Sequence, residues 1–181
     1  HCVDHLSSSS PAAARLRQSE AESFARADVV FVTSHALRDL ARAHNPEVHL
    51  VPSGVDVDRF TSADRTAPLP EDLRGIPRPI VGYLGGVHQW FDQPLVTTLA
   101  ERRPDWSFVL VGPRQTEVSR LERLPNVYLL GTRGPDAVPD YLRGFDVATV
   151  PYLLAEYTHY VYPVKLNEYL AMGLPVVSSP L

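Results

Sequence analysis

The chain has 181 residues, of which 44% are hydrophobic and 21% are charged, and its formal net charge is −4. These proportions are typical of a soluble protein with a packed core, and the negative charge argues against a surface that binds nucleic acid broadly. The single cysteine, Cys2, excludes an internal disulfide and a cysteine-based zinc cluster. No apolar run approaches the length of a membrane span, about 18 residues.

Seven short apolar runs recur along the sequence. Their apolar residues are continuous rather than alternating, which predicts strands that are buried on both faces, as in a parallel sheet. The predicted strands are residues 29–32, 48–51, 80–84, 108–111, 127–130, 147–150 and 176–177.

Helical patterns lie between these strands, and several begin at a residue that can cap a helix. The alternation of strands and helices predicts an α/β fold with right-handed crossovers. The predicted helices are 10–27, with Ser10 as cap and Pro11 as first residue; a second one that is capped by Ser34 and stops at Asn45 and Pro46; a third that begins at Asp92; and two more over 115–123 and 135–143.

Residues 61–79 differ from the rest of the chain. They contain four prolines, several charged residues and few large apolar ones. This composition predicts a linker or a domain boundary.

Both ends of the sequence point to a longer protein. The chain starts at His1 rather than at Met, and it stops soon after its last apolar run. In an open α/β sheet a helix is expected to follow and cover such a strand. We therefore expect this sequence to be a fragment.

The segment from Tyr162 to Val177 predicts a short helix that ends cleanly and leads into a buried strand. Pro163 suits the first helical position, and Gly173 can take the left-handed conformation that ends a helix. Lys165 would lie in the first turn, where the helix dipole disfavours a cation. A broken local rule suggests a functional site, because the positive helix end and Lys165 together would attract an anion.

Glu168 follows Lys165 by three residues and shares its face of the helix. Its carboxylate can accept hydrogen bonds from hydroxyl groups. A ligand that carries both an anionic group and several hydroxyl groups would fit these residues, and a nucleotide sugar is such a ligand. The alternative for these two residues is an exposed ion pair on a surface helix, worth only a few tenths of a kcal/mol. The spacing by itself favours this alternative, since such pairs are common.

Three loops after predicted strands carry further candidates, because ligands of doubly wound sheets bind at the carboxyl ends of strands. Gly85 and Gly86 would let backbone amides approach a phosphate, although two glycines after a strand often form only a turn. Arg133 could contact a base or a phosphate, whereas an arginine exposed to solvent is the commoner outcome. Residues 151–162 contain four tyrosines that suit sugar or base contacts, or that simply pack under the loop.

Motifs of several other chemistries are absent from the sequence. It has no G-x-S-x-G elbow of a serine hydrolase. It also lacks the P-loop, the dinucleotide-binding G-x-G-x-x-G string and the H-E-x-x-H pair of a zinc protease. The histidines are scattered, and no metal site is predicted.

Taken together, these segments resemble retaining glycosyltransferases of the GT-B fold, in the large family 4 group. The match includes residues 27–34, which resemble a strand-to-helix segment of the amino-terminal domain. Residues 51–60 are similar to the segment P-N-G-V-D-x-x-x-F, with Ser53 in place of the Asn, and residues 80–86 to the first strand and glycine loop of the donor-binding domain. The most specific match is residues 163–177, which resemble the signature P-x-K-L-x-E-Y-L-A-x-G-x-P-V-V.

The resemblance implies a UDP- or GDP-linked sugar donor between two Rossmann-like domains, with no obligatory metal. It implies that residues 1–60 are the end of the acceptor-side domain, that 61–79 are the linker, and that 80–181 are an incomplete donor-binding domain. Glu168 would bind the ribose hydroxyls, and the helix opening near Pro163 would face the diphosphate.

Two departures from the family pattern affect the site. Many family members carry a Glu eight positions before the one that matches Glu168, where this chain has Tyr160. Many also carry Arg and Lys after the glycine loop, where this chain has V-H-Q-W-F-D, so that His88 and Lys165 become the candidates for the diphosphate. A subgroup with W-F-D and K-L-x-E-Y strings resembles this chain more closely and is often linked to cell-surface polysaccharides. The expected donor-binding residues are Gly85, Gly86, His88, Arg133, Tyr160, Pro163, Lys165 and Glu168, and no catalytic residue is assigned.

We therefore expect the parent protein to be a hexosyltransferase that transfers a sugar to a glycan or lipid-linked acceptor with retention, in polysaccharide or glycan synthesis. The fragment alone is expected to be inactive. A non-catalytic nucleotide-sugar-binding protein and a GT-B nucleotide-sugar 2-epimerase are the alternatives. The expected location is the cytoplasm. Peripheral contact with the inner face of the membrane, made by the missing amino-terminal half, is left open.

Overall fold

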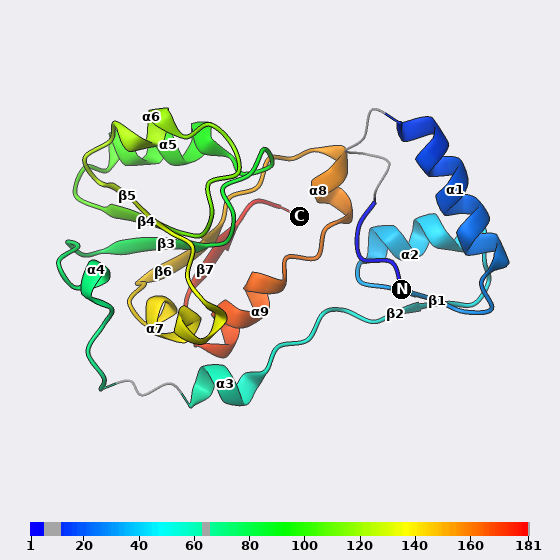
Figure 1. The fold of residues 1–181 in the computed structure, drawn as a ribbon, viewed down its shortest axis with the longest axis horizontal. Coiled ribbons are helices and arrows are strands. Elements are labelled where there is room, and N and C mark those ends of the chain that lie inside the picture. Colours follow the sequence, from blue (N-terminus) through cyan, green and yellow to red (C-terminus); the bar gives the residue numbers. More distant parts are fainter. Residues whose placement is uncertain (6–11, 63–65, 181) are drawn as a thin grey trace. The chain divides into compact units, whose positions relative to one another are not determined.

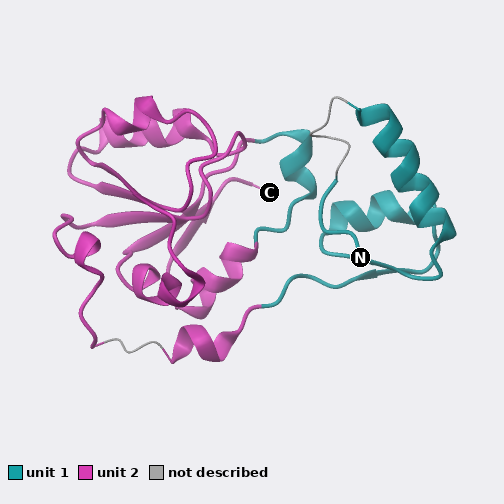
Figure 2. Cartoon of the chain, in the orientation of Figure 1, with its two compact units in different colours: residues 1–54, 154–163, 181 teal, residues 55–153, 164–180 magenta. Residues whose placement is uncertain are grey.

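The computed structural model describes residues 1–5, 12–62 and 66–180. The contacts among these residues divide the chain into two compact units (Figure 2). Unit 1 consists of residues 1–54 and 154–163, and unit 2 consists of residues 55–153 and 164–180. Within the described residues no helix has both the length and the apolar composition that crossing a membrane requires.

Unit 1 contains a parallel pair of strands packed with helices. Val30 pairs with Val48 and Val32 with Leu50. Its elements are α1 (Ala13–Arg26), β1 (Val30–Val32), α2 (His35–Arg42), β2 (Val48–Leu50) and α8 (Glu156–Tyr160). Its core consists of buried Phe24, Val30, Val32, Leu37, Ala41 and Val48.

The predicted cap of the second helix is confirmed. The Ser34 hydroxyl oxygen accepts a hydrogen bond from the Leu37 N–H at 3.2 Å, and α2 begins at His35, directly after Ser34. This satisfies one of the donors that a helix start leaves unpaired. The predicted cap at Ser10 and Pro11 lies outside the described residues.

Unit 2 is built on a five-stranded sheet in which every neighbouring pair is parallel (Figure 1). The strand order is β5-β4-β3-β6-β7. The strands are β3 (Ile80–Leu84), β4 (Ser107–Val111), β5 (Val127–Gly131), β6 (Val147–Val150) and β7 (Val176–Ser178). The parallel pairing confirms the expected α/β fold, whereas the expected burial on both faces holds for β4 but not for β7, where Val177 is exposed.

Helices lie on both faces of this sheet. Figure 1 shows α5 and α6 on one face and α7 and α9 on the other. The helices of unit 2 are α3 (Val57–Thr61), α4 (Glu71–Arg74), α5 (Gln93–Arg102), α6 (Ser119–Glu122), a 3-10 turn (Pro135–Ala137), α7 (Val138–Leu142) and α9 (Val164–Ala171). The helix predicted over 115–123 is reduced to α6, because the Gln115 N–H donates to the Val87 carbonyl and holds this part of the segment extended beside another loop.

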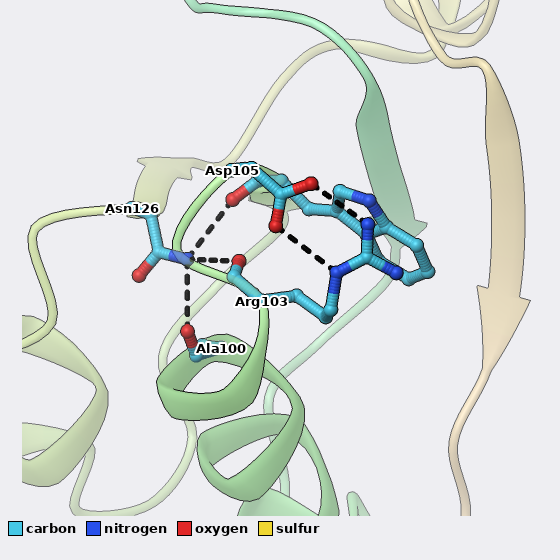
Figure 3. Close-up of polar contacts among 5 residues, drawn as sticks. Ala100, Arg103, Asp105 and Asn126 are labelled. Atoms are coloured by element: carbon cyan, nitrogen blue, oxygen red, sulfur yellow. Dashed lines mark hydrogen bonds and ion pairs between the residues drawn. The ribbon is translucent and has the colours of Figure 1, made fainter.

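Side chains cap both ends of α5. The Asp92 carboxylate accepts from a backbone N–H of the first turn, as expected for the predicted helix start. At the other end the buried Asn126 amide donates to the carbonyls of Ala100, Arg103 and Trp106, at 3.1, 3.1 and 2.9 Å (Figure 3). The Ala100 carbonyl lies in the last turn of α5, where carbonyls lack partners within the helix, whereas the Arg103 carbonyl also accepts from the Trp106 N–H. Asn126 therefore joins the start of β5 to the end of α5.

The end of α9 forms as the sequence predicts. Gly173 has a φ of 73°, and its N–H donates to the Leu170 carbonyl at 2.9 Å. The N–H of Leu174 donates to the Tyr169 carbonyl at 3.0 Å. This pair of bonds is the arrangement in which a left-handed glycine ends a helix and turns the chain, here toward β7.

Candidate functional site

Three glycines line the carboxyl edge of the unit 2 sheet. Gly85, Gly112 and Gly131 follow or end β3, β4 and β5, with φ values of 144°, 152° and 76°. The Gly85 N–H donates to the Val111 carbonyl at 2.8 Å, and the Gly112 N–H to the Gly131 carbonyl at 2.9 Å. A Cβ at Gly112 would lie 2.0 Å from the Gly85 carbonyl oxygen. This edge is therefore a surface of closely packed backbone.

Gly112 was not among the residues predicted from the sequence. Its signal was present, because Gly112 directly follows a buried strand just as Gly85 does. The need for glycine comes from contact with Gly85, 27 positions earlier in the numbering. That contact exists only once β3 and β4 are paired.

The strand order reverses beside β3. β4 and β5 lie on one side of β3, and β6 and β7 lie on the other. The loops after β3 and β6 pair with each other, since the Asp92 N–H donates to the Pro151 carbonyl and the Leu153 N–H to the Trp90 carbonyl, both at 2.8 Å. Such a reversal opens the crevice in which doubly wound sheets bind ligands.

Lys165 brings its charge to this reversal. Its ammonium donates a hydrogen bond to the Tyr152 hydroxyl and lies 4.7 Å from the centroid of that ring. It lies 5.1 Å from the centroid of the Tyr83 ring. A Cβ at Gly85 would lie 3.2 Å from the Lys165 nitrogen. The structure thus brings Lys165 to the glycine edge.

Tyr83 and Tyr169 are buried and form hydrogen bonds with the backbone at the end of β3 and in the loop that follows it. Burial raises the pKa of Tyr83, and its protonated hydroxyl donates to the Gly86 carbonyl at 2.9 Å. The fully buried Tyr169 of α9 accepts a hydrogen bond from the Leu84 N–H at 2.8 Å. Because Leu84 directly precedes Gly85, Tyr169 fixes the helix that carries Lys165 against the end of β3.

Gly86 lies beside this cluster. A Cβ there would lie 2.4 Å from a side-chain oxygen of Gln115. Replacing Gly86 would therefore require the flexible Gln115 side chain to move. The structure places Gly86, like Gly85, at the predicted edge.

His88 is half-buried in the loop after β3. Its Nδ1 accepts a hydrogen bond from the Trp90 N–H at 3.1 Å, and its ring centroid lies 5.4 Å from that of Tyr152. Burial, and then the charge of Lys165, hold the pKa of His88 below its ordinary value. The structure therefore joins His88 to the Lys165 cluster, as a neutral ring at pH 7.

Glu168 lies one turn after Lys165 on α9. Burial raises the pKa of its carboxyl group, while the positive charges of Lys165 and Arg59 act in the opposite direction. Among the described residues its carboxylate makes no hydrogen bond and no ion pair, to Lys165 or to any other residue. The surface ion pair considered for Lys165 and Glu168 is thus not formed, and the carboxylate remains available as an acceptor.

Arg133 is held by three partners within unit 2. Its Nε donates to the Tyr141 hydroxyl at 2.5 Å, one terminal nitrogen pairs with Asp72, and the other donates to the Thr132 carbonyl. Burial acts to raise the pKa of Asp72, but the hydrogen bonds from Arg133 and Tyr141 hold it below its usual range. The guanidinium therefore connects α4 and α7 to the end of β5, and contact with a ligand stays a prediction.

The remaining two predicted residues, Tyr160 and Pro163, belong to unit 1. The Tyr160 ring centroid lies 4.3 Å from that of His5, and the Tyr160 carbonyl accepts from the Ser34 hydroxyl at 2.8 Å. Pro163 directly precedes Val164, the first residue of α9. The segment 151–162, expected to be a loop, contains the short helix α8.

The cluster in unit 2 has a defined chemistry. An ammonium group and a neutral imidazole with a free N–H favour an anion, and the adjacent carboxylate favours hydroxyl groups. The described residues contain no group of three or more His, Cys, Asp or Glu side chains that could hold a metal ion. The site therefore suits an anionic ligand that carries a polyol.

Comparison with known proteins agrees with this chemistry. The sequence profile of a protein family described as "Glycosyl transferases group 1" matches residues 78–181. TuaH of Bacillus subtilis (strain 168), named as a teichuronic acid biosynthesis glycosyltransferase, is 38% identical over 143 residues, which are 77% of this chain and 36% of TuaH. EpsF of the same organism, named as a glycosyltransferase, is 30% identical over 144 residues, 73% of this chain and 36% of EpsF. The chain thus spans about a third of each of these two relatives.

Solved structures share the fold. Anabaena Alr3699/HepE, crystallised with UDP and glucose, superimposes with a TM-score of 0.68 and 20% identity, over 92% of this chain and 48% of that protein. Its complex with UDP alone gives a TM-score of 0.70 and 18% identity over 92% and 49%. The glycosyltransferase AviGT4 gives 0.55 and 14% identity over 90% and 59%. The chain therefore has the α/β architecture of GT-B glycosyltransferases.

Proposed function

The chain belongs to the group 1 glycosyl transferases, and we propose on this premise that the protein containing it transfers a sugar from a nucleotide-diphosphate sugar to an acceptor. The chain spans about a third of the relatives that it matches, TuaH and EpsF, so the transfer reaction is proposed for the longer protein. For this chain itself we propose binding of the nucleotide diphosphate.

One observation carries this proposal. The ammonium of Lys165 lies against Gly85 at the strand-order reversal, and the unpaired carboxylate of Glu168 follows one turn later on the same helix. The diphosphate would lie at Gly85 and Gly86 with Lys165 as its cation, and Glu168 would accept hydrogen bonds from the ribose hydroxyls. We further propose that residues 80–181 are the donor-binding domain, that 61–79 are a linker and that 1–60 are part of the acceptor-side domain.

The proposed reaction needs the leaving diphosphate to be stabilised. Breaking the bond between the sugar and the diphosphate leaves negative charge on the departing phosphate oxygen. Prepositioned donors in a partly buried site stabilise such charge most strongly as it develops. Lys165 is held in place by Tyr152 and therefore needs little rearrangement to do so. We propose that the sugar is transferred with retention and that no metal is obligatory.

The acceptor is proposed to be a cell-surface glycan or its lipid-linked precursor. Support comes from the identity of 38% to TuaH, whose name refers to teichuronic acid biosynthesis. The donor base is proposed to be uracil or guanine. Uracil is supported by HepE, which shares the fold and was crystallised with UDP.

A second candidate is a nucleotide-sugar-binding protein without transfer activity. Tyr160 favours it, because Tyr160 occupies the position at which many members of the family carry a carboxylate, and its ring contacts His5. The two candidates share the binding site and differ only in turnover by the longer protein.

Calorimetric titration tests the shared site. UDP, GDP and their sugars would be titrated into the chain, into Glu168→Ala and into Glu101→Ala, which removes an exposed carboxylate from α5. We expect Glu168→Ala to weaken binding about tenfold, or about 1.4 kcal/mol, and Glu101→Ala to leave it unchanged. Equal binding by all three proteins, or no binding by a folded chain, would contradict the proposal.

A further inference from the structure

The hydrogen bond at Nδ1 of His88 determines which ring nitrogen carries the proton. The Trp90 N–H donates to Nδ1 over 3.1 Å. A nitrogen that accepts a hydrogen bond must hold a lone pair, so a neutral imidazole in this geometry carries its proton on Nε2. A proton on Nδ1 would break the bond and bring two donors together. The backbone of the loop thus selects one tautomer.

The charges around His88 favour the neutral ring. Lys165 of α9 faces it with a positive charge, and Tyr152 faces it from the loop after β6 with an aromatic ring. Among the described residues no carboxylate forms an ion pair with His88. Burial and the nearby ammonium therefore both oppose an imidazolium.

Nε2 of His88 is an unused donor. Among the described residues it has no hydrogen-bond partner, because the one hydrogen bond of this ring is accepted by Nδ1. His88 follows Gly86 by two residues and contacts Tyr152, which holds Lys165. The donor thus belongs to the same edge at which Gly85 and Lys165 meet.

We infer that His88 binds the diphosphate as a neutral donor, through Nε2–H, and contributes a hydrogen bond rather than a positive charge. This inference rests on the proposed function and adds to it the protonation state of one residue. A phosphate oxygen accepts from a neutral N–H as readily as from a backbone amide. His88 would then add a neutral donor beside the ammonium of Lys165.

Two substitutions separate the two ring nitrogens. His88→Asn places an amide oxygen where Nδ1 accepts from Trp90, in the manner of an Asx turn, and removes the distant donor. His88→Gln extends an amide N–H toward the position of Nε2 and gives up the contact with Trp90. Titration of UDP into both variants therefore measures the donor and the loop contact separately.

We expect His88→Gln to bind UDP within about threefold of the unmodified chain, and His88→Asn to bind it at least about fivefold more weakly. Long-range ¹H–¹⁵N NMR of the unmodified chain at pH 7 should show Nε2 protonated and Nδ1 unprotonated. Unchanged binding by His88→Asn, a proton on Nδ1, or an imidazolium would overturn the inference. If Glu168→Ala still weakened UDP binding in that case, the proposed function would stand. A folded chain that bound no UDP would overturn both.

Discussion

The ammonium of Lys165 donates a hydrogen bond to the hydroxyl of Tyr152. Lys165 lies in the first turn of α9, and Tyr152 lies in the loop that leaves β6. The bond holds a cation between two aromatic rings and directly against Gly85. The first turn of a helix disfavours a cation, and the hydrogen bond to Tyr152 stabilises Lys165 there.

Lys165 is the only lysine in the sequence, which makes it accessible to selective chemistry. An amine-acylating reagent should modify two groups in this chain, Lys165 and the α-amino group of His1. We expect saturating UDP to slow acylation of Lys165 by about tenfold, because the diphosphate would cover the ammonium. Peptide mass spectrometry measures both rates in one sample, and the α-amino group serves as an internal control. Equal rates with and without UDP would argue against contact with Lys165.

Tyr152→Phe tests whether the hydrogen bond positions Lys165. The substitution keeps the ring and removes the hydroxyl acceptor, and one such hydrogen bond contributes about 1 kcal/mol. We expect UDP binding to weaken about fivefold and the free energy of unfolding to fall by no more than about 1 kcal/mol. Tyr128→Phe, on β5 and without a hydrogen bond to its hydroxyl among the described residues, is the matched control. If both variants bound UDP equally well, the positioning role would be wrong.

Gly112→Ala tests the packed backbone at the carboxyl edge. A Cβ there would lie 2.0 Å from the Gly85 carbonyl oxygen, and the φ of 152° disfavours any side chain. The Gly85 backbone can move away only at a high cost in energy. We therefore expect the free energy of unfolding to fall by about 2 kcal/mol or more, from strain at position 112 and displacement of the Gly85 loop. Gly134→Ala, where a Cβ would meet nothing within 4 Å, should be nearly neutral.

Unfolding of these glycine variants can be followed by tryptophan fluorescence in urea. Trp90 and Trp106, the two tryptophans of the sequence, both belong to unit 2. The signal therefore reports on the unit that contains both glycines. A Gly112→Ala midpoint equal to that of Gly134→Ala would show that the edge can relax.

Glu168→Gln tests a cost in stability at the site. Because burial raises the pKa of Glu168 in the folded chain, the folded state binds a proton more tightly than the unfolded one. Its ionised carboxylate therefore lowers stability fully above the folded pKa, and that loss fades as pH falls from the folded pKa to the unfolded pKa, about 4.3. We expect Glu168→Gln to be more stable than the unmodified chain at pH 7 and equally stable near pH 4. Urea unfolding at both values measures this, and a destabilised variant at pH 7 would contradict it.

Local signals in the sequence were sufficient for much of this fold. The continuous apolar runs predicted a parallel sheet, because burial on both faces leaves no polar positions in a strand. Ser34 and Asp92 predicted helix starts, and Gly173 a helix end, because caps and left-handed turns depend on atoms only a few residues away. The signature around Lys165 and Glu168 identified the family for the same reason, since it lies within one short segment.

The tertiary structure decided what depends on contacts between distant segments. Only the pairing of β3 with β4 makes glycine necessary at position 112, and only the pairing of β3 with β6 brings Lys165 beside Gly85. Asn126 and Arg133 likewise gain their partners from other elements, so Arg133 joins α4 to α7. The sequence alone determined most of the helices and strands and the family they belong to, although α6 is shorter than predicted and α8 lies in a segment expected to be a loop. The folded chain determined which side chains meet, because their distances are set by the sheet and not by the spacing along the chain.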